Sequence, residues 1–451
     1  EQLGVTLGIR DFSRLAGRTD ARSGVLRLLK RALRRGRGGA VAERIRVAEE
    51  AIPPVLSHAA SFARDLERLL PAGAQPARIA RDRDLAGVSP HALDQLLASI
   101  GSLVRALESL GETVDREGRA ALKPEGLEAR DELRARALAW AEMERSLRSV
   151  IGLEEKGSAF YLDRDDRGTP RLNRRPVRVG SALRQTLFLL CDRVLLTSAT
   201  LRAGSEFGPL LEALGFGPRE VRAEALPSPF PLEEQVFCAV QDGLEPNDPG
   251  YPERLSELIV DLATSLRRNT LVLLTSYQMM DQVAERCGPP LKRAGIRLLR
   301  QLPGEAAAPL AEAFRAGEGT VLLGAASFWE GVDFPGTALE VLLIARLPFP
   351  VPTDPLMEAR SELLVAEGGD PFRDLALPEA VLRFRQGIGR LIRTAGDRGA
   401  VIVADPRLTR ASYGRVFAAE LPRRPLVTAS RAELSERVRR WFSREEAACH
   451  A

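Results

Sequence analysis

The chain has 451 residues, more than one hydrophobic core usually organises, so the sequence predicts about two to four domains. Hydrophobic residues make up 45% of it and charged residues 28%, the composition of an ordinary folded protein, which excludes a disordered or fibrous chain. The formal net charge of +4 at pH 7 suits a nucleic-acid partner but is too small to establish one, because the arginine bias behind it also fits a GC-rich genome.

The four cysteines lie far from one another along the chain, and the three histidines are equally scattered. Neither a zinc-ligand spacing nor a disulfide framework is indicated, so we expect a protein of the reducing cytoplasm. No apolar run reaches the length of about 18 residues that a membrane-spanning helix needs. The chain begins at Glu1 rather than methionine and lacks a signal-peptide pattern, which suggests a piece of a longer protein.

Residues 1 to 36 mix short apolar runs with a basic end that precedes the glycine pair at 38–39. A DNA contact fits this basic end, but a solvated helix end is the commoner role of such a cluster. The cluster consists of Lys30, Arg31, Arg34, Arg35 and Arg37.

From about 40 to 155 the apolar spacing is helical, which predicts a helical bundle or hairpin. The clearest helix is predicted to begin with Ser89 as N-cap and Pro90 as its first residue, and to stop at Gly111. Its leucines recur three and four residues apart, so they share one stripe. A second helix is predicted over 126–150, in which Trp140 fits a core position better than a base-stacking one.

After about residue 156 short apolar runs alternate with amphipathic helices, such as those predicted over 251–268 and 377–394. Runs of this kind indicate a parallel sheet covered on both faces, so the second half is predicted to be α/β. The predicted strands are 194–196, 236–240, 271–274, 321–323, 341–344 and 401–403.

The most specific motif is QGIGRLIRT at 386–394, at the end of the helix predicted to begin near residue 378. Arg390 and Arg393 are three residues apart, so we expect both guanidinium groups on one helical face, where they could meet a polyphosphate. Gly387 and Gly389 each cost a helix roughly 1 kcal/mol relative to alanine, which suggests that a ligand or another backbone approaches closely. A surface helix weakened by glycines, with its arginines in water, is the alternative.

A second motif runs from 327 to 336 as SFWEGVDFPG and is followed by a strand and by RLPF at 346–349. Glu330, Gly331 and Asp333 are predicted in a loop at the carboxyl edge of a sheet, where ligands bind in α/β folds. Phe328 and Trp329 fit core packing and DNA contact equally well.

Two weaker motifs each follow an apolar strand. Ser198, Ala199 and Thr200 could link a nucleotide sensor to a strand-binding surface through short hydrogen bonds. Thr275, Ser276 and Tyr277 supply hydroxyl groups and an N-cap for the next helix, and a plain helix cap explains them as well.

In this order and spacing the four motifs resemble the later motifs of superfamily 2 helicases, and the second motif followed by QGIGRLIRT and DRG resembles the DinG/XPD branch. Ser228-Pro229-Phe230 and Asp405-Pro406-Arg407 also match runs of that family. The resemblance implies a RecA-like parallel-sheet helicase lobe, an all-helical arch insert and a partial first RecA-like lobe. The implied segments are a first-lobe remnant at 1–36, the arch at 37–155, a return to the first lobe at 156–205 and the second lobe at 206–451.

The resemblance also implies an enzyme that couples ATP hydrolysis to movement on single-stranded DNA and to unwinding, in the 5′-to-3′ direction. Arg390 would stabilise charge on the transferred phosphoryl group, and Arg393 and Gln386 would contact the phosphates. Glu330, Gly331, Asp333 and the two helix glycines would bind or couple the nucleotide. The implied DNA contacts are Thr275, Ser276, Tyr277, Phe328 and Trp329, on single strands and duplex junctions.

A phosphate-binding loop is missing, because none of the four lysines follows a glycine. The Asp131–Glu132 pair lies in a helical stretch, so no DEAH box is present either. The resemblance therefore implies that Mg²⁺ is held mainly by a first lobe outside this chain, and that no iron–sulfur cluster is encoded here. The competing hypothesis is a non-catalytic single-strand-binding or regulatory module. A third alternative, a Rossmann-type enzyme, is disfavoured because no Gly-x-Gly-x-x-Gly motif follows a predicted strand.

Overall fold

The computed structural model divides the chain into two compact units. The first unit comprises Glu1–Ala182 and Val351–Glu367, and the second comprises Leu183–Pro350 and Gly368–Ala451. The structure describes residues 4–33, 39–71, 76–80, 82–85, 87–153, 157–198, 200–202, 207–422 and 427–449.

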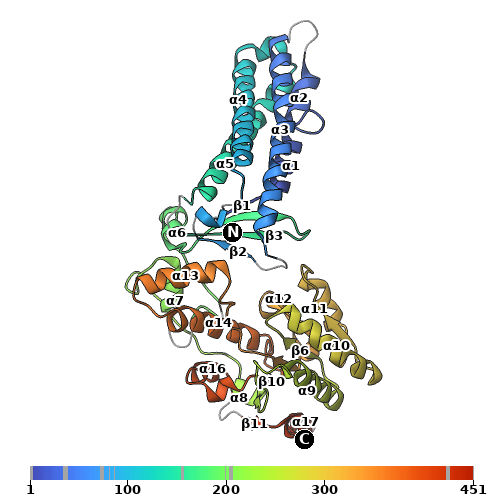
Figure 1. Ribbon diagram of the computed structural model, residues 1–451. Helices are drawn as coiled ribbons and strands as arrows, with labels where there is room; N and C mark the ends of the chain where they lie inside the picture. The colour runs from blue at the N-terminus through green and yellow to red at the C-terminus, as the bar shows by residue number, and fades with distance from the viewer. Residues whose placement is uncertain are drawn as a thin grey trace. The chain divides into compact units, whose positions relative to one another are not determined.

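Long helices build most of the first unit (Figure 1). Helix α4 lies against both α3 and α5, and two shorter helices pack alongside. Trp140 is fully buried among them and donates its indole N–H to Thr19 Oγ1 at 3.0 Å, which confirms its predicted core position. The helices are α1 (Ile9–Thr19), α2 (Val25–Ala32), α3 (Gly39–Leu69), α4 (Pro90–Ala121) and α5 (Pro124–Ile151).

Helix α4 begins as predicted but ends later. The backbone N–H of Ala92 donates to Ser89 Oγ at 3.4 Å, so Ser89 caps the helix ahead of Pro90. The predicted stop at Gly111 is wrong, because the helix continues to Ala121. Buried Leu110 and Val114 carry the apolar stripe past the glycine, and this packing outweighs a glycine penalty of about 1 kcal/mol.

A four-stranded antiparallel sheet completes the first unit, in the order β1-β4-β3-β2. Its strands were not predicted from the sequence. Helix α13 (Pro355–Ala366) packs on β3, where Ala359 meets Ala159 and Val177, and Arg78 forms two hydrogen bonds of 2.6 Å with Glu362. The strands are β1 (Val5–Gly8), β2 (Ala77–Ile79), β3 (Ser158–Arg164) and β4 (Pro170–Pro176).

The second unit is built on a seven-stranded sheet in the order β11-β5-β10-β9-β6-β8-β7. Every pairing is parallel, which confirms the predicted α/β class. The strands are β5 (Val236–Gln241), β6 (Thr270–Leu273), β7 (Leu298–Arg300), β8 (Val321–Gly324), β9 (Val341–Ile344), β10 (Gly399–Val403) and β11 (Val427–Ala429).

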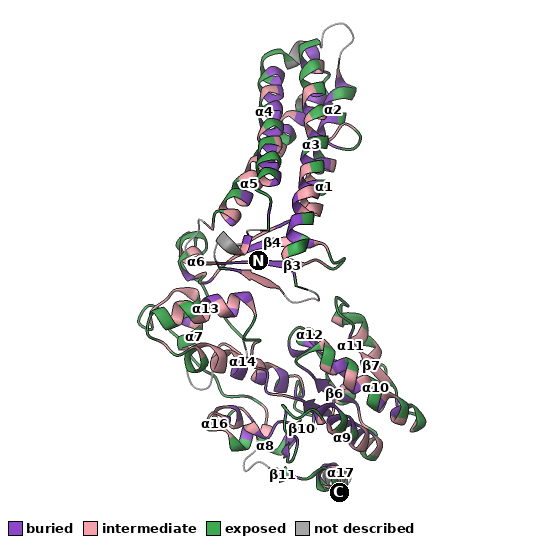
Figure 2. Ribbon diagram, viewed as in Figure 1, coloured by how far each residue is buried: buried purple, intermediate pink, exposed green. Residues whose placement is uncertain are grey.

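Helices cover both faces of this sheet. Successive residues of each strand point to opposite sides, so its apolar side chains form two faces, and each face is packed against helices. In β6, Leu271 and Leu273 join one buried cluster while Val272 joins the other. Strands β5, β6, β8, β9 and β10 are accordingly buried along their length, as Figure 2 shows for β6, whereas β7 and β11 are only partly buried. One face carries α9 (Tyr251–Leu266), α10 (Tyr277–Arg293) and α17 (Arg431–Cys449). The other carries α11 (Ala307–Arg315), α12 (Ala326–Trp329), α14 (Leu377–Ile388) and α16 (Gly414–Ala418).

The remaining helices are short. They are α6 (Gly180–Thr186), α7 (Gly208–Leu214), α8 (Leu232–Gln235) and α15 (Arg407–Arg410), with a π-helical turn, η4, at Pro371–Ala376. None of the helices within the described ranges has the length and apolar character needed to cross a membrane.

The strand predicted at 194–196 is wrong: this segment is irregular, and Leu195 is 87% exposed. An apolar strand of a parallel sheet is stable only when neighbours pair with it, and no strand in the described part of the chain pairs here. The compact units also divide the chain differently from the segments 1–36, 37–155, 156–205 and 206–451. The assignment of those segments to lobes and an arch stays a prediction.

Candidate functional site

Helix α14 ends just before the two motif arginines. Its last residue is Ile388 and Gly389 is the C-cap, so Arg390 and Arg393 lie in the turn that follows. The prediction that both arginines project from one helical face is therefore wrong. Past Gly389 the backbone bonds tighten, with Arg390 N donating to Gly387 O at 3.1 Å and Leu391 N to Ile388 O at 3.0 Å.

Asp397 holds the turn that carries Arg393. Its carboxylate accepts the backbone N–H groups of Arg393 at 2.7 Å and Thr394 at 2.9 Å, and the Thr394 hydroxyl as well. Burial alone would raise the pKa of Asp397, but these hydrogen bonds outweigh it and keep the pKa below its ordinary value. The sequence signal that we missed is an aspartate four residues after Arg393, a spacing at which a carboxylate can cap a turn.

Gln235 ties the same turn to the start of β5. Its side-chain amide donates to Ala395 O at 2.8 Å and to Asp397 O at 3.0 Å. The turn is thus anchored to the sheet from two sides, which fixes the backbone from which Arg393 projects.

Arg390 is anchored to the loop that follows α12. Nε and Nη2 donate to Trp329 O at 3.3 and 3.2 Å, and Nη1 donates to Val332 O. These bonds use one N–H on each guanidinium nitrogen, which leaves one on Nη1 and one on Nη2 for a ligand. Burial, and then repulsion from Arg393, lower the pKa of Arg390, but arginine remains charged at any pH of interest.

Arg393 reaches the same loop by a different contact. Its Nε lies 2.8 Å from Asp333 Oδ1, and these side chains are 37% and 62% exposed. An ion pair this exposed contributes only about 0–1 kcal/mol. A phosphate could therefore compete with Asp333 for the guanidinium group of Arg393 at little cost.

The loop itself alternates between core and solvent. Val332 and Phe334 are buried, whereas Glu330, Gly331 and Asp333 are exposed. Gly331 has a φ of +81°, a backbone conformation that glycine adopts without strain.

The loop begins near the predicted edge of the sheet, because Trp329, which precedes Glu330, donates its indole N–H to Leu274 O just past the carboxyl end of β6, but the loop then leaves this edge. Arg315 donates to Asp333 O at 3.1 Å, and Arg315 ends α11 shortly before β8 begins. Asp333 thus lies beside the amino end of β8 and not at the carboxyl edge of the sheet.

Phe328 and Trp329 are core residues, 0% and 2% exposed. Trp329 donates its indole N–H to Leu274 O at 3.2 Å. A Cβ on Gly387 would stand only 2.9 Å from the Trp329 ring, so glycine is what allows α14 to approach it. The predicted DNA contact of these two aromatic residues is wrong, because both rings are buried in the hydrophobic core of the second unit. Gly389 needs no such approach, since its nearest neighbours are carbonyls of its own helix.

The remaining predicted residues are more exposed. Ser198 Oγ lies 3.3 Å from Thr200 Oγ1, and Ala199 lies outside the described residues. Ser276 caps α10 by accepting Met279 N at 3.2 Å, which confirms the predicted N-cap. Its neighbour Thr275 is exposed and its neighbour Tyr277 is half-buried. Gln386 is half-buried on α14.

A buried polar network lies at the carboxyl ends of β9 and β10 and was not predicted from the sequence. The Tyr251 hydroxyl donates to Ala345 O and lies 3.1 Å from Ala404 O, and burial raises the pKa of Tyr251. Fully buried Asp405 accepts Leu347 N at 2.9 Å and pairs with Arg407. The network fixes the backbone of the RLPF segment at this edge.

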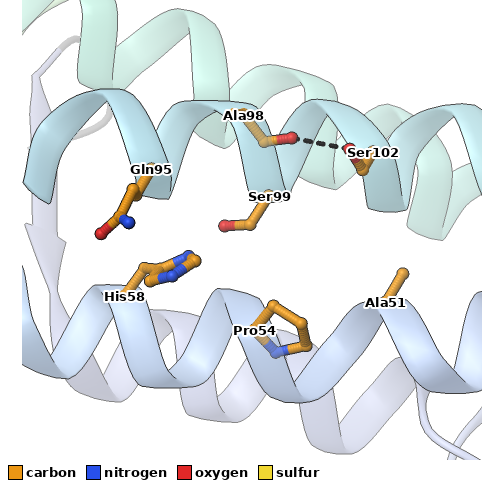
Figure 3. Close-up of a pocket in the computed structure, with 7 residues that line it drawn as sticks. All are labelled: Ala51, Pro54, His58, Gln95, Ala98, Ser99 and Ser102. Atoms are coloured by element: carbon orange, nitrogen blue, oxygen red, sulfur yellow. Dashed lines mark hydrogen bonds between the residues drawn. The ribbon is translucent and has the colours of Figure 1, made fainter. Parts of the chain in front are cut away.

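The first unit has a hollow of about 310 Å³ between α3 and α4 (Figure 3). The His58 ring lies in it, and its buried Nδ1 has no hydrogen-bond partner among the residues that the structure describes. Its polar wall belongs to α4, where Ser102 donates to Ala98 O at 2.9 Å. The lining residues are Ala51, Pro54, His58, Gln95, Ala98, Ser99 and Ser102, and no charged side chain is among them.

Within the described ranges, no group of three or more His, Cys, Asp or Glu side chains is placed to hold a metal ion.

A parallel sheet covered on both faces fits the predicted RecA-like fold. Residues 259–424 match the family model described as the helicase C-terminal domain. Solved XPD helicase structures have the same fold. The structure titled "XPD_Helicase" has a TM-score of 0.52, 14% identity, and coverage of 95% of this chain and 66% of that one. The structure of S. tokodaii Xpd4 has a TM-score of 0.54 and 13% identity, with coverage of 95% of this chain and 72% of that one.

Among curated proteins, the chain is similar to the 3′-5′ exonuclease DinG of Bacillus subtilis, with 36% identity over 61% of this chain and 31% of that protein. It is also similar to the ATP-dependent DNA helicase YoaA of Haemophilus influenzae, with 39% identity over 51% of this chain and 35% of that protein. The ATP-dependent helicase DinG of Mycobacterium tuberculosis shows 34% identity over 61% of this chain and 41% of that protein. The resemblance to the C-terminal portion of DinG/XPD-type helicases is confirmed, and the chain spans well under half of the length of these relatives.

Proposed function

We propose that this chain is the C-terminal part of an ATP-dependent DNA helicase and supplies the second lobe of its ATP site. The observation that carries the proposal is the convergence of Arg390 and Arg393 on the loop of Trp329 and Asp333. Two positioned guanidinium groups, one still holding unused N–H donors, suit the charge that develops on a phosphoryl group during transfer.

Six of the predicted residues have a role at the nucleotide in this proposal. Arg390 donates to the transferred phosphoryl group, and Gln386 and Arg393 bind and orient the phosphates, with Arg393 exchanging Asp333 for phosphate. Glu330 and Gly331 border the nucleotide on the exposed side of the loop. The proposed ATP is bound together with a first lobe that carries the phosphate-binding loop and holds Mg²⁺.

A short chain of contacts connects these arginines to the proposed DNA contacts. Arg390 holds the Trp329 carbonyl, and the Trp329 indole holds the Leu274 carbonyl at the end of β6. Thr275 and Tyr277 follow directly at the surface. Ser198 and Thr200 would join the two sites from the other side, because the carbonyl of nearby Arg202 accepts Arg385 Nη1 of α14 at 2.9 Å. We propose that this path couples phosphate binding to the grip on a single strand, in a cytoplasmic enzyme that moves in the 5′-to-3′ direction and acts at duplex junctions.

The second candidate is a non-catalytic single-strand-binding or regulatory module. The lack of a Gly-Lys pair in the sequence favours it. Against it stands Arg390, whose guanidinium is half-buried and held by two carbonyls. A module that only binds DNA has no need of an arginine fixed in this way.

We expect this chain to bind single-stranded DNA weakly and with a strong salt dependence. The net charge of +4 is small, and counterion release lowers affinity steeply as salt rises. The measurement is titration of a labelled oligonucleotide at two salt concentrations. A chain that does not bind at low salt would contradict the proposed function, whichever of the two candidates were preferred.

A further inference from the structure

Phe372 is the exception among the aromatic side chains. Of the phenylalanine, tyrosine and tryptophan residues in the described ranges, it alone is exposed, with 41% of its surface accessible. It lies in the π-helical turn η4 that leads into α14. Single π turns are rare, and many are found at functional sites.

The turn holds Phe372 in a fixed position. Asp370 Oδ1 accepts the backbone N–H groups of Phe372 at 2.9 Å and Arg373 at 3.2 Å. Asp374 Oδ2 in turn accepts Asp370 N at 2.8 Å. Both carboxylates are thus engaged with the backbone of the turn, so the ring is presented on a rigid support.

A second ring backs the first. Phe349, the last residue of the RLPF segment, lies 5.7 Å from Phe372 with an angle of 25° between the planes, which is a stacked arrangement. Tyr413 meets Phe372 edge-on at 5.2 Å and Phe349 edge-on at 5.5 Å. Tyr413 thus contacts both rings of the stack and restricts how far the Phe349 ring can tilt.

The buried network described above fixes this platform to the sheet. Asp405 holds Leu347 two residues before Phe349, and the Arg407 guanidinium paired with Asp405 lies 5.9 Å from the Phe349 ring. The stack of Phe349 and Phe372 is thus preorganised at the carboxyl ends of β9 and β10. Exposed Arg373 follows next to Phe372.

We propose that Phe372, backed by Phe349, is a platform on which one unpaired nucleic-acid base stacks. The proposal rests on the proposed function, because it names a contact of that function's single strand. A base suits the platform because its flat face extends an existing stack of rings, and because stacking tolerates any base. A protein partner suits it less, since one ring is far below the interface area of about 1,000 Å² that a specific complex needs.

The test compares two oligomers of equal length, oligodeoxythymidylate and a fully abasic strand with the same phosphates. We expect Phe372→Ala to weaken binding of oligodeoxythymidylate by about 5- to 150-fold, the equivalent of ~1–3 kcal/mol for one stacked base. Binding of the abasic strand should stay unchanged. Phe372→Leu, which keeps an apolar side chain, should lose most of the same affinity, and Phe372→Trp should retain it.

Leu302→Ala is the matched control, because Leu302 is 46% exposed in the same unit and distant in sequence. It should bind both oligomers like the parent chain. Parent-like binding of oligodeoxythymidylate by Phe372→Ala, or an equal loss on both oligomers, would overturn the platform and leave the proposed function standing. If the parent chain binds neither oligomer at low salt, the platform and the proposed function are both overturned.

Discussion

Replacing Arg390 by alanine is expected to lower DNA-stimulated ATP turnover by about 10³- to 10⁵-fold, or roughly 4–7 kcal/mol of transition-state stabilisation. The protein for this test joins the present chain to a first lobe that has a phosphate-binding loop. The loss is large because an arginine finger acts where charge develops on the phosphoryl group. Affinity for single-stranded DNA should stay nearly unchanged, since the guanidinium of Arg390 faces the loop of Trp329 and Val332.

Arg390→Lys should restore little turnover. A lysine ammonium cannot hold the carbonyls of Trp329 and Val332 and still present two parallel donors to a phosphate. Arg383→Ala is the matched control on α14, the helix that precedes the turn of Arg390, because Arg383 is 37% exposed and pairs with Glu379 at 3.8 Å. Steady-state ATPase with saturating DNA, alongside oligonucleotide affinity, makes the comparison. An Arg390→Ala protein that keeps more than about a tenth of the turnover, or loses DNA affinity in proportion, would show that Arg390 is not the finger.

Trp329→Ala is expected to destabilise the second unit by about 3–5 kcal/mol. The indole is buried against Gly387 and makes a hydrogen bond to Leu274 O, so alanine leaves both a cavity and an unpaired carbonyl. Denaturant unfolding measures the change.

A useful comparison for that variant is Trp329→Phe, which keeps a ring in the cavity and should cost less. If Trp329→Ala unfolds like the parent chain but binds single-stranded DNA more weakly, the ring contacts DNA and our assignment of it to the core fails.

The sequence predicted the sheet of the second unit well, because parallel strands buried on both faces are continuous apolar runs. The strands β5, β6, β8, β9 and β10 all have this character and were predicted. The strands β7 and β11 have only three residues each, too few for a pattern. The antiparallel sheet of the first unit was missed because its strands carry many charged residues, as in Pro170–Pro176.

The candidate site was predicted in its residues but not in its geometry. The spacing of Arg390 and Arg393 indicated that they act together, and the structure brings both to one loop. Both arginines lie in a turn, because the Asp397 carboxylate accepts the backbone N–H of Arg393 after the helix has ended. Helical periodicity in the sequence could not predict this hydrogen bond. The burial of Trp329 could not be predicted either, since the sequence does not show that α14 packs against the ring at Gly387.

The most direct test of the central claim is ATP turnover by two proteins, the present chain alone and the same chain joined to a phosphate-binding first lobe. Our account predicts no hydrolysis above background by the chain alone, with or without single-stranded DNA, because no Gly-Lys pair in it can cradle the phosphates. It predicts DNA-stimulated hydrolysis by the joined protein. Turnover by a pure sample of the chain alone, or a joined protein that binds ATP but does not respond to DNA, would contradict the account.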